Sequence, residues 1–350
     1  MARRACCDGE RGGRTTPRRE GEMTGVVTLS VEIELGWGYH DLQRYDRLST
    51  DGKRELTALD RLLDRCDQLD VPFTFDVVGR LFDDERSSDD APHPDGWFDT
   101  VPDDPGMLFY SPEMVGGIQR ADVDHEICTH TYSHTICDDV SPDVVAWDLQ
   151  RAAEVHREVG EPAPVSLVPP RHFTPDRSVL RDAGIEIVRT VGYDPAPTKL
   201  HKLNRLLFDP LPPKPPRLVD GVVETYCAPF TTLTASSLPA GAKDELAMFR
   251  PVPRAVRQRL HERYLRRSVE KAAEQNSYTH LWCHLHDLAN DDQWKPIHSF
   301  LGTLADMRDR GEVEVLPMVA LNEHVRGRAG DDRERERTRS PVDAPVGGVQ

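Results

Sequence analysis

The sequence predicts an α/β fold built on a parallel β-sheet. Short apolar runs alternate with amphipathic stretches along residues 24–325, and this alternation is typical of strands joined by helices. The chain has 350 residues, of which 38% are hydrophobic and 30% charged, so it can bury a sizeable core. Right-handed strand–helix–strand connections place such strands parallel to one another, in a sheet that is open or closed into a barrel.

The expected elements follow one another along the chain. The first strand is expected at 26–33, a continuous apolar run, and is followed by a helix over 52–69 with leucines at helical spacing. Ser141-Pro142-Asp143 predicts a helix start, because proline is favoured at the first helical position. Further strands are expected at 73–77, 126–128, 165–168, 185–188, 221–227, 279–283 and 313–316. Further helices are expected at 175–183, 253–274 and 295–310.

One domain accounts for residues 24–325. Residues 1–23 and 326–350 contain too few apolar groups to offset the entropy of ordering, so we expect disordered tails there, and Met23 is an alternative start. Two stretches interrupt the alternation. Residues 83–106 are acidic and rich in proline and glycine, and residues 194–217 hold seven prolines and are interpreted as a long loop.

Composition excludes several classes of protein. The net charge of −16 argues against a basic face that binds nucleic acid. The sequence contains no run of about 18 apolar residues, so it predicts no membrane span. The first 22 residues lack the apolar core of a secretory signal, so we expect a cytoplasmic protein with free thiols at its seven cysteines. The chain has 37 Asp but only 7 Lys, which resembles halophilic archaeal proteins; a GC-rich mesophile is the alternative.

Two acids close the first predicted strand. Glu32 and Glu34 are two residues apart, and alternating strand side chains place them on one face. The carboxyl ends of parallel strands are where α/β folds bind ligands, so the pair is a candidate for chemistry. The alternative is that both acids are solvated at the end of the strand.

Two histidines follow the third predicted strand. If one helical turn forms there, His130 and His134 lie on one face and can share a metal ion with a carboxylate, leaving an open position for water. Two surface histidines are one alternative. A closed structural zinc site that adds Cys128 and Cys137 is another.

Two further strand ends carry polar side chains. Arg171 follows Val168-Pro169-Pro170, where an arginine can orient a carboxylate through a bidentate pair. His284 and His286 alternate onto one face after the apolar run 279–283, and either could act as a general acid. Each signal is weak alone, but acids, histidines and an arginine all at one rim of the sheet indicate a catalytic site.

Together these motifs resemble the polysaccharide deacetylase superfamily (NodB-like, carbohydrate esterase family 4), in a form similar to haloarchaeal members. The segment 126–134, EICTHTYSH, is similar to the family pattern E-I-x-x-H-T-x-S-H. Glu34-Leu35-Gly36-Trp37-Gly38 and Val168-Pro169-Pro170-Arg171 resemble D-x-E-x-x-W-G and F-P-R-N segments of a subgroup. The resemblance spans about residues 25–325 and implies a distorted (β/α)7 barrel, a TIM-like single domain, with a metal at the carboxyl ends of the strands.

The resemblance also implies roles for individual residues. His130 and His134 correspond to metal ligands, and Glu32 to the family's first acid, the general base. The family's second acid, a ligand, is normally adjacent; Ile33 stands there, so Glu34 supplies that oxygen, and the roles of the two glutamates could be exchanged. Arg171 corresponds to the residue that holds the base.

The family's general acid corresponds to His284. A competing alignment uses His286-Asp287 instead. The family's late aspartate, which tunes this histidine, has no clear counterpart in the sequence. The expected function is metal-dependent hydrolysis of an N-acyl group, most simply N-acetyl, from an amino sugar or glycan, with Zn²⁺ as the metal; cobalt, nickel and manganese suit the same ligands. The alternatives are hydrolysis of another C–N bond, as in a deformylase or ureide hydrolase, and a catalytically inactive glycan-binding barrel.

Overall fold

Seven parallel strands close into a barrel, which confirms the predicted fold class. The structure is a computed structural model that describes residues 24–83, 91–102, 106–193 and 198–339. Around the barrel the strands pair in the order β1-β2-β3-β4-β5-β7-β8, and β8 pairs with β1 to close the ring. These strands are β1 (Gly25–Ile33), β2 (Thr74–Val77), β3 (Glu126–Thr129), β4 (Ser166–Leu167), β5 (Ile187–Val191), β7 (Val222–Cys227) and β8 (Tyr278–His284).

Two short strands extend the barrel. β9 (Val313–Val315) lies parallel to the first half of β1, whose second half pairs with β2. β6 (Arg217–Val219) is antiparallel to β7.

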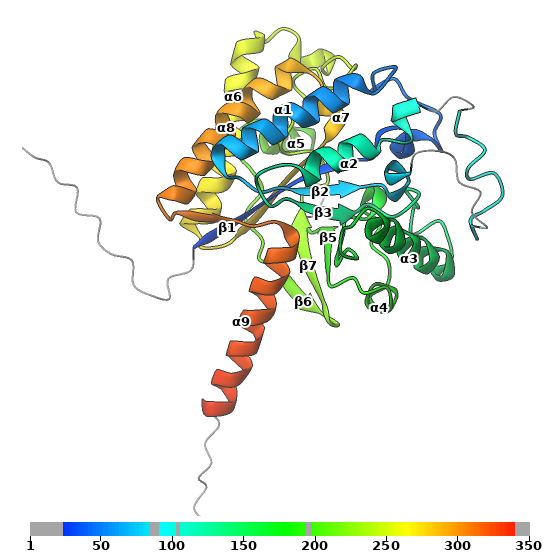
Figure 1. The fold of residues 1–350 in the computed structure, drawn as a ribbon. Coiled ribbons are helices and arrows are strands. Elements are labelled where there is room, and N and C mark those ends of the chain that lie inside the picture. Colours follow the sequence, from blue (N-terminus) through cyan, green and yellow to red (C-terminus); the bar gives the residue numbers. More distant parts are fainter. Residues whose placement is uncertain (1–23, 84–90, 103–105, 194–197, 340–350) are drawn as a thin grey trace, which may run out of the picture.

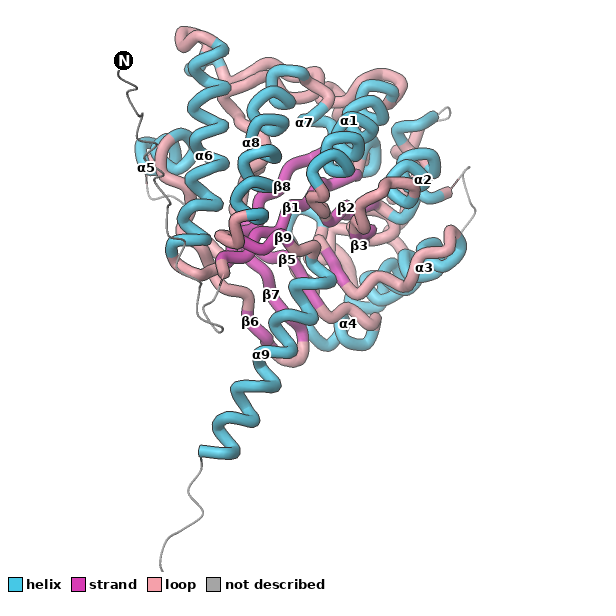
Figure 2. Tube along the Cα trace, turned by 60° about the vertical axis from the view of Figure 1, so that its left-hand side comes forward, coloured by secondary structure: helices cyan, strands magenta, loops and turns pink. Residues whose placement is uncertain are grey.

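Helices cover the outside of the barrel, and Figures 1 and 2 show α1, α6 and α8 side by side on one flank. In both views the last helix projects away from the rest of the molecule. The α-helices are α1 (Lys53–Leu69), α2 (Pro112–Gln119), α3 (Pro142–Glu158), α4 (Arg177–Asp182), α5 (Lys199–Leu207), α6 (Arg254–Glu274), α7 (Leu285–Leu288), α8 (Asp291–Asp309) and α9 (Met318–Arg339).

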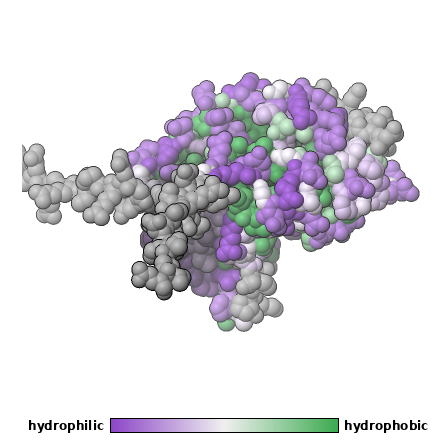
Figure 3. All heavy atoms as spheres, turned by 90° about the horizontal axis from the view of Figure 1, so that it is seen from below, coloured by the Kyte–Doolittle hydropathy of each residue, from purple (hydrophilic) through white to green (hydrophobic). Residues whose placement is uncertain are grey.

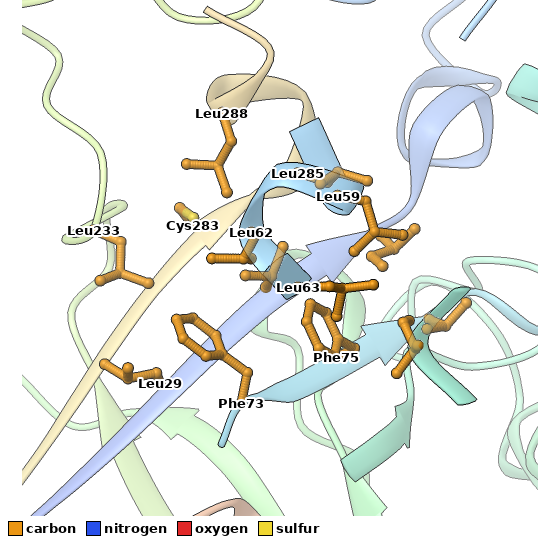
Figure 4. Close-up of a cluster of buried hydrophobic side chains, with 14 of the residues drawn as sticks. Leu29, Leu59, Leu62, Leu63, Phe73, Phe75, Leu233, Cys283, Leu285 and Leu288 are labelled. Carbon is orange, nitrogen blue, oxygen red and sulfur yellow. The ribbon is translucent and has the colours of Figure 1, made fainter. Parts of the chain in front are cut away.

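The main apolar core lies between the strands and the flanking helices. Leu29 of β1 packs in one cluster with Leu59 of α1, Phe75 of β2 and Leu301 of α8, and Figure 4 shows the part of this cluster around β1 and β2. A second cluster joins Val26, Ile187, Val223, Met318 and Leu321, side chains of β1, β5, β7 and α9. The start of α9 therefore packs against the amino-terminal ends of the strands, far from the rim where the polar motifs lie.

Most predicted elements occur within a few residues of their expected bounds, and three differences stand out. The proline-rich stretch 194–217 was expected to be a loop but contains α5 and β6, and α2 was not predicted because its eight residues include two glycines. The boundary expected at residue 325 falls within α9, which continues to Arg339 through a segment rich in arginine and glutamate, both good helix formers. The expected tail at 1–23 lies outside the described residues.

In the part of the chain that is described, no helix combines the length and apolar character needed to cross a bilayer. The face shown in Figure 3 is largely hydrophilic, with small hydrophobic areas between polar side chains.

Candidate active site

The end of β1 presents two buried carboxylates. Glu32 is the last-but-one residue of β1, and Glu34 follows the strand in a right-handed helical backbone conformation just before the 3₁₀ turn Leu35–Tyr39. Each glutamate is only 5% exposed. A Cβ atom at Gly38 would lie 2.3 Å from Cδ of Glu34, so only glycine leaves room for this carboxylate. The predicted pairing of the two acids at one site is therefore present, and neither is solvated.

The two motif histidines converge without the helical turn expected from their spacing. The loop after β3 is irregular, with positive φ at Thr131 (61°) and His134 (56°), and Thr131 Oγ1 accepts a hydrogen bond of 3.0 Å from Thr135 N. The ring centroids of His130 and His134 are 5.2 Å apart. A left-handed backbone in non-glycine residues is strained, and such strain is characteristic of functional loops.

Glu34, His130 and His134 form a set that suits a divalent metal ion. Glu34 Oε2 lies 3.1 Å from His134 Nε2 and 3.6 Å from His130 Nε2, and one ligand atom from each residue fits within a 4.8 Å cluster. His130 Nδ1 lies 2.7 Å from Val168 O; a carbonyl only accepts, so Nδ1 carries the proton. Its Nε2 then offers a lone pair, is buried and has no hydrogen-bond partner among the described residues. Two imidazoles and one carboxylate, with the tautomer of His130 fixed, match a catalytic zinc site.

The histidine loop is held by an aspartate that the sequence analysis did not identify. Asp148 of α3 is fully buried and accepts hydrogen bonds from the Tyr132 and Ser133 backbone N–H groups, at 2.6 and 3.4 Å. The hydroxyls of Ser133 and Thr135 donate to its other oxygen at 2.6 and 2.8 Å. A carboxylate of the following helix thus fixes the backbone between His130 and His134.

The structure does not place Arg171 where it was expected. Its guanidinium pairs with Asp41, 2.7 Å from both carboxylate oxygens, on a partly exposed surface. Arg189 of β5 holds Glu32 instead: it donates to Glu32 Oε1 and, at 2.9 Å, to Ser30 Oγ. Because β5 and β1 are not neighbours in the ring, these contacts cross the barrel interior. Sequence reasoning missed Arg189 because a single arginine inside an apolar run, IVRTV, carries no motif.

His284 stands between the two glutamates. Its Nε2 lies 3.2 Å from Glu32 Oε2 and 3.6 Å from Glu34 Oε1, at the end of β8. Asp287 Oδ2 lies 3.8 Å from His284 Nδ1 and accepts a hydrogen bond of 2.9 Å from Thr234. Asp287 therefore places a third carboxylate beside His284, on the side of Nδ1.

His286 has a different setting from His284. Its Nε2 lies 3.2 Å from the Tyr39 hydroxyl and 3.5 Å from Asp287 Oδ1, and it contacts neither glutamate. Of the two histidines considered for the acid, only His284 contacts Glu32 and Glu34.

Burial and charge set the protonation of these groups. Burial alone would raise the pKa of Glu32, but the positive charges of Arg189 and His284 outweigh it and hold the pKa well below the usual range. Burial alone would lower the pKa of His284, but the Glu32 and Glu34 carboxylates outweigh it and raise the pKa well above the usual value. The site therefore holds an ionised carboxylate beside a protonated imidazole, which is the pairing of a base and an acid.

The alternative of a structural zinc site with two cysteines finds no support. Cys128 Sγ donates to Ser166 O at 3.1 Å, and Cys137 Sγ lies 3.7 Å from Thr135 O. Among the described residues, the side-chain groups arranged closely enough to hold a metal contain histidine, glutamate and aspartate but no cysteine.

Comparisons with known proteins agree with this architecture. Residues 50–188 match the family model of polysaccharide deacetylases, which supports the superfamily suggested by the sequence motifs. This matched segment contains His130 and His134 and ends just before Arg189. A search of curated protein sequences finds no match.

Several solved structures share the fold. A protein from Mycobacterium smegmatis assigned to the polysaccharide deacetylases has a TM-score of 0.58 at 18% identity, covering 93% of this chain and 96% of its own. One from Pseudomonas aeruginosa PAO1 with the same assignment has a TM-score of 0.55 at 11% identity, covering 85% and 90%. Puue allantoinase has a TM-score of 0.54 at 11% identity, covering 91% and 97%. At these identities the likeness establishes the fold.

Proposed function

We propose that this chain is a metal-dependent hydrolase that removes an N-acyl group, most simply N-acetyl, from an amino sugar or glycan. One observation carries the proposal: the metal-ligand set Glu34, His130 and His134 shares a buried site with Glu32 and His284, whose reactive atoms lie 3.2 Å apart. The match to the polysaccharide deacetylase family model supports the same activity. We propose Zn²⁺ as the metal because two imidazoles and a carboxylate suit it.

The reaction adds water to the acyl carbon and breaks the C–N bond, releasing a carboxylic acid and an amine. When bound by Glu34, His130 and His134, the metal supplies a Lewis acid that polarises the acyl carbonyl and makes water more acidic. Glu32, kept ionised by Arg189, accepts the proton of the attacking water. His284, protonated beside the two carboxylates, donates a proton to the leaving nitrogen, which would otherwise depart as an unstable amide anion.

Separate substitutions of the two glutamates test these roles. Glu32→Gln removes the base but no ligand, so we expect metal content to persist while kcat falls about 10²–10⁴-fold. Glu34→Gln replaces a charged ligand by a neutral oxygen, so we expect weaker metal binding and partial recovery of rate in excess metal. Metal analysis of purified protein and release of acetate from N-acetylated sugars are the measurements, with exposed Glu274→Gln as control.

Opposite results would exchange the roles. Metal lost in Glu32→Gln but retained in Glu34→Gln would make Glu32 the ligand. If neither variant changed metal content or rate, the hydrolase proposal would fail.

Cleavage of a ureide C–N bond is the second candidate, favoured by the shared fold with Puue allantoinase. Conversion of a cyclic ureide to its ring-opened ureido acid, assayed beside acetate release from N-acetylated sugars, separates the two. We further propose a cytoplasmic enzyme adapted to high salt, on the support of the aspartate-rich, lysine-poor composition.

A further inference from the structure

A cavity opens directly beside the proposed acid. It has a volume of about 200 Å³, and His284 and Asp287 contribute to its wall. The rest of the wall combines apolar side chains, such as Leu238 and Leu246, with the hydroxyl-bearing Thr231 and Ser236. A substrate whose leaving nitrogen meets His284 would extend into this cavity.

Two cations line the same cavity and have no acidic partner. Among the described residues, neither Arg47 nor Lys243 forms an ion pair, although the chain carries 60 acidic residues. By contrast, Lys53 pairs with Asp51 at 2.9 Å and Lys271 with Asp209 at 2.6 Å.

The other acids of the cavity are already engaged. Asp244 pairs with Arg250 at 3.2 Å, and Asp287 accepts the Thr234 hydroxyl and faces His284. The two cations are therefore available to a ligand.

Hydrogen bonds hold the backbone segments that carry these two cations. The turn from Ala240 to Lys243 closes on itself by two hydrogen bonds of 2.9 Å, and Ala242 N donates to Arg47 O at 2.9 Å. Gly241, at φ 56°, presses against Arg47 O, and a Cβ atom there would come within 2.4 Å of it. The Arg47 loop and the Lys243 turn are thus locked together beside the active site.

The charge of Arg47 acts on Tyr39, a neighbour of His286. Burial raises the pKa of Tyr39 to about 12, and the Arg47 charge acts in the opposite direction on this hydroxyl. His284 lines the cavity and lies 3.2 Å from Glu32, so the cavity with its cations and the proposed site form one continuous region.

We propose that this cavity is an anion subsite, in which Arg47 and Lys243 bind a carboxylate or phosphate group of the N-acylated substrate. The proposal rests on the proposed function and narrows its substrate class to acidic amino sugars. A protein of net charge −16 repels anions in general, so two uncompensated cations beside the acid supply local attraction. The guanidinium binds either oxyanion in a bidentate manner, and the ammonium adds a second charge.

Three probes that share an N-acetyl group test the subsite: N-acetylglucosamine is neutral, its 1-phosphate carries a phosphate, and N-acetylmuramic acid carries a carboxylate. We expect the wild-type protein to bind at least one acidic sugar about tenfold or more tightly than the neutral one in calorimetry. Arg47→Gln and Lys243→Gln should each reduce that preference by about tenfold, mainly through Kd or KM. Lys295→Gln, an exposed lysine outside the cavity with the same charge change, is the matched control and should keep the preference.

Binding and turnover separate the two proposals. Preference for an acidic sugar in binding that depends on Arg47 and Lys243 supports the subsite even if none of the sugars is hydrolysed, and the failure then belongs to the proposed reaction. Equal affinity for neutral and acidic sugars, or a preference unchanged in both variants, overturns the subsite whether or not acetate is released. The acidic sugar that binds more tightly, the 1-phosphate or N-acetylmuramic acid, shows whether the subsite takes a phosphate or a carboxylate.

Discussion

The two faces of β1 differ in how they use buried space. One face turns Val27, Leu29, Val31 and Ile33 into the apolar core under the helices, where Figure 4 shows Leu29 near Phe73. The other face carries Thr28, Ser30 and Glu32 into the barrel, where Arg189 and His280 meet Ser30 at 2.9 Å each. All of these side chains are buried, so burial alone does not distinguish structure from function.

The polar face of β1 depends on specific partners. Truncating an apolar side chain removes buried apolar surface and leaves a cavity. Removing the partner of a buried charge leaves the cost of taking that charge out of water without a compensating interaction. Asp76 of β2 illustrates the cost: burial raises its pKa to about 7, and neither of its oxygens has a hydrogen-bond partner in the described part of the chain. Its nearest cation is Arg189, 3.8 Å away.

The largest effect is therefore expected at Arg189. Arg189→Met leaves Glu32 and Asp76 without their shared cation, and removing one partner of a buried ion pair costs about 3–5 kcal/mol. Urea denaturation measures this change in the free energy of unfolding. Arg267→Met is the control, because its pairs with Glu270 and Glu274 are exposed and should contribute less than about 1 kcal/mol. Equal losses in the two variants would contradict a special dependence of the polar face on its partners.

A smaller and purely structural effect is expected on the opposite face. Leu29→Ala should cost about 2–5 kcal/mol, because it removes a fully buried side chain and leaves a cavity. Metal content and the pH dependence of turnover should not change, since Leu29 points away from the glutamates. Loss of metal in folded Leu29→Ala would show that the two faces are coupled, and Ile33→Val provides a milder change nearer the site.

The sequence predicts the apolar and the polar parts of the molecule to different extents. Apolar residues recur along the sequence with the spacing of strands and helices, so the sequence predicted most elements and the α/β barrel. The residues that carry motifs, Glu32, Glu34, His130, His134 and His284, were also found, and the structure brings them together.

What escaped prediction depends on contacts across the barrel or between distant segments. Arg189 and Asp148 are single polar residues within ordinary strand and helix patterns, and only the closed ring or the packing of α3 shows what they touch. The sequence points to Arg171, which follows a strand within a motif, but Arg171 pairs with Asp41 at the surface. Asp287 was adjacent to a predicted residue, yet its role needs the turn into α7 that aims it at His284.

The smallest effect concerns a buried polar side chain whose ring nitrogens accept and donate no hydrogen bond within the described part of the chain. His156 of α3 is fully buried beside Phe82, with ring centroids 4.7 Å apart, and neither ring nitrogen has a hydrogen-bond partner among the described residues. Burial lowers its pKa from 6.5 to about 4. Between pH 6.5 and 4 the unfolded chain therefore binds a proton that the folded chain does not, so stability falls as pH falls through this window.

His156→Leu removes that titration and should make the protein less sensitive to acid. Each pH unit in the window is worth up to about 1.4 kcal/mol, so the stability of His156→Leu relative to the wild type should rise by about 1–2 kcal/mol from pH 7 to pH 5. Urea denaturation at the two pH values measures this difference. Leu149→Val, a buried change in the same helix without a titrating group, should shift stability equally at both. If His156→Leu did the same, the histidine would not be held neutral, and a buried polar group without partners would cost less than the contrast between the two faces of β1 implies.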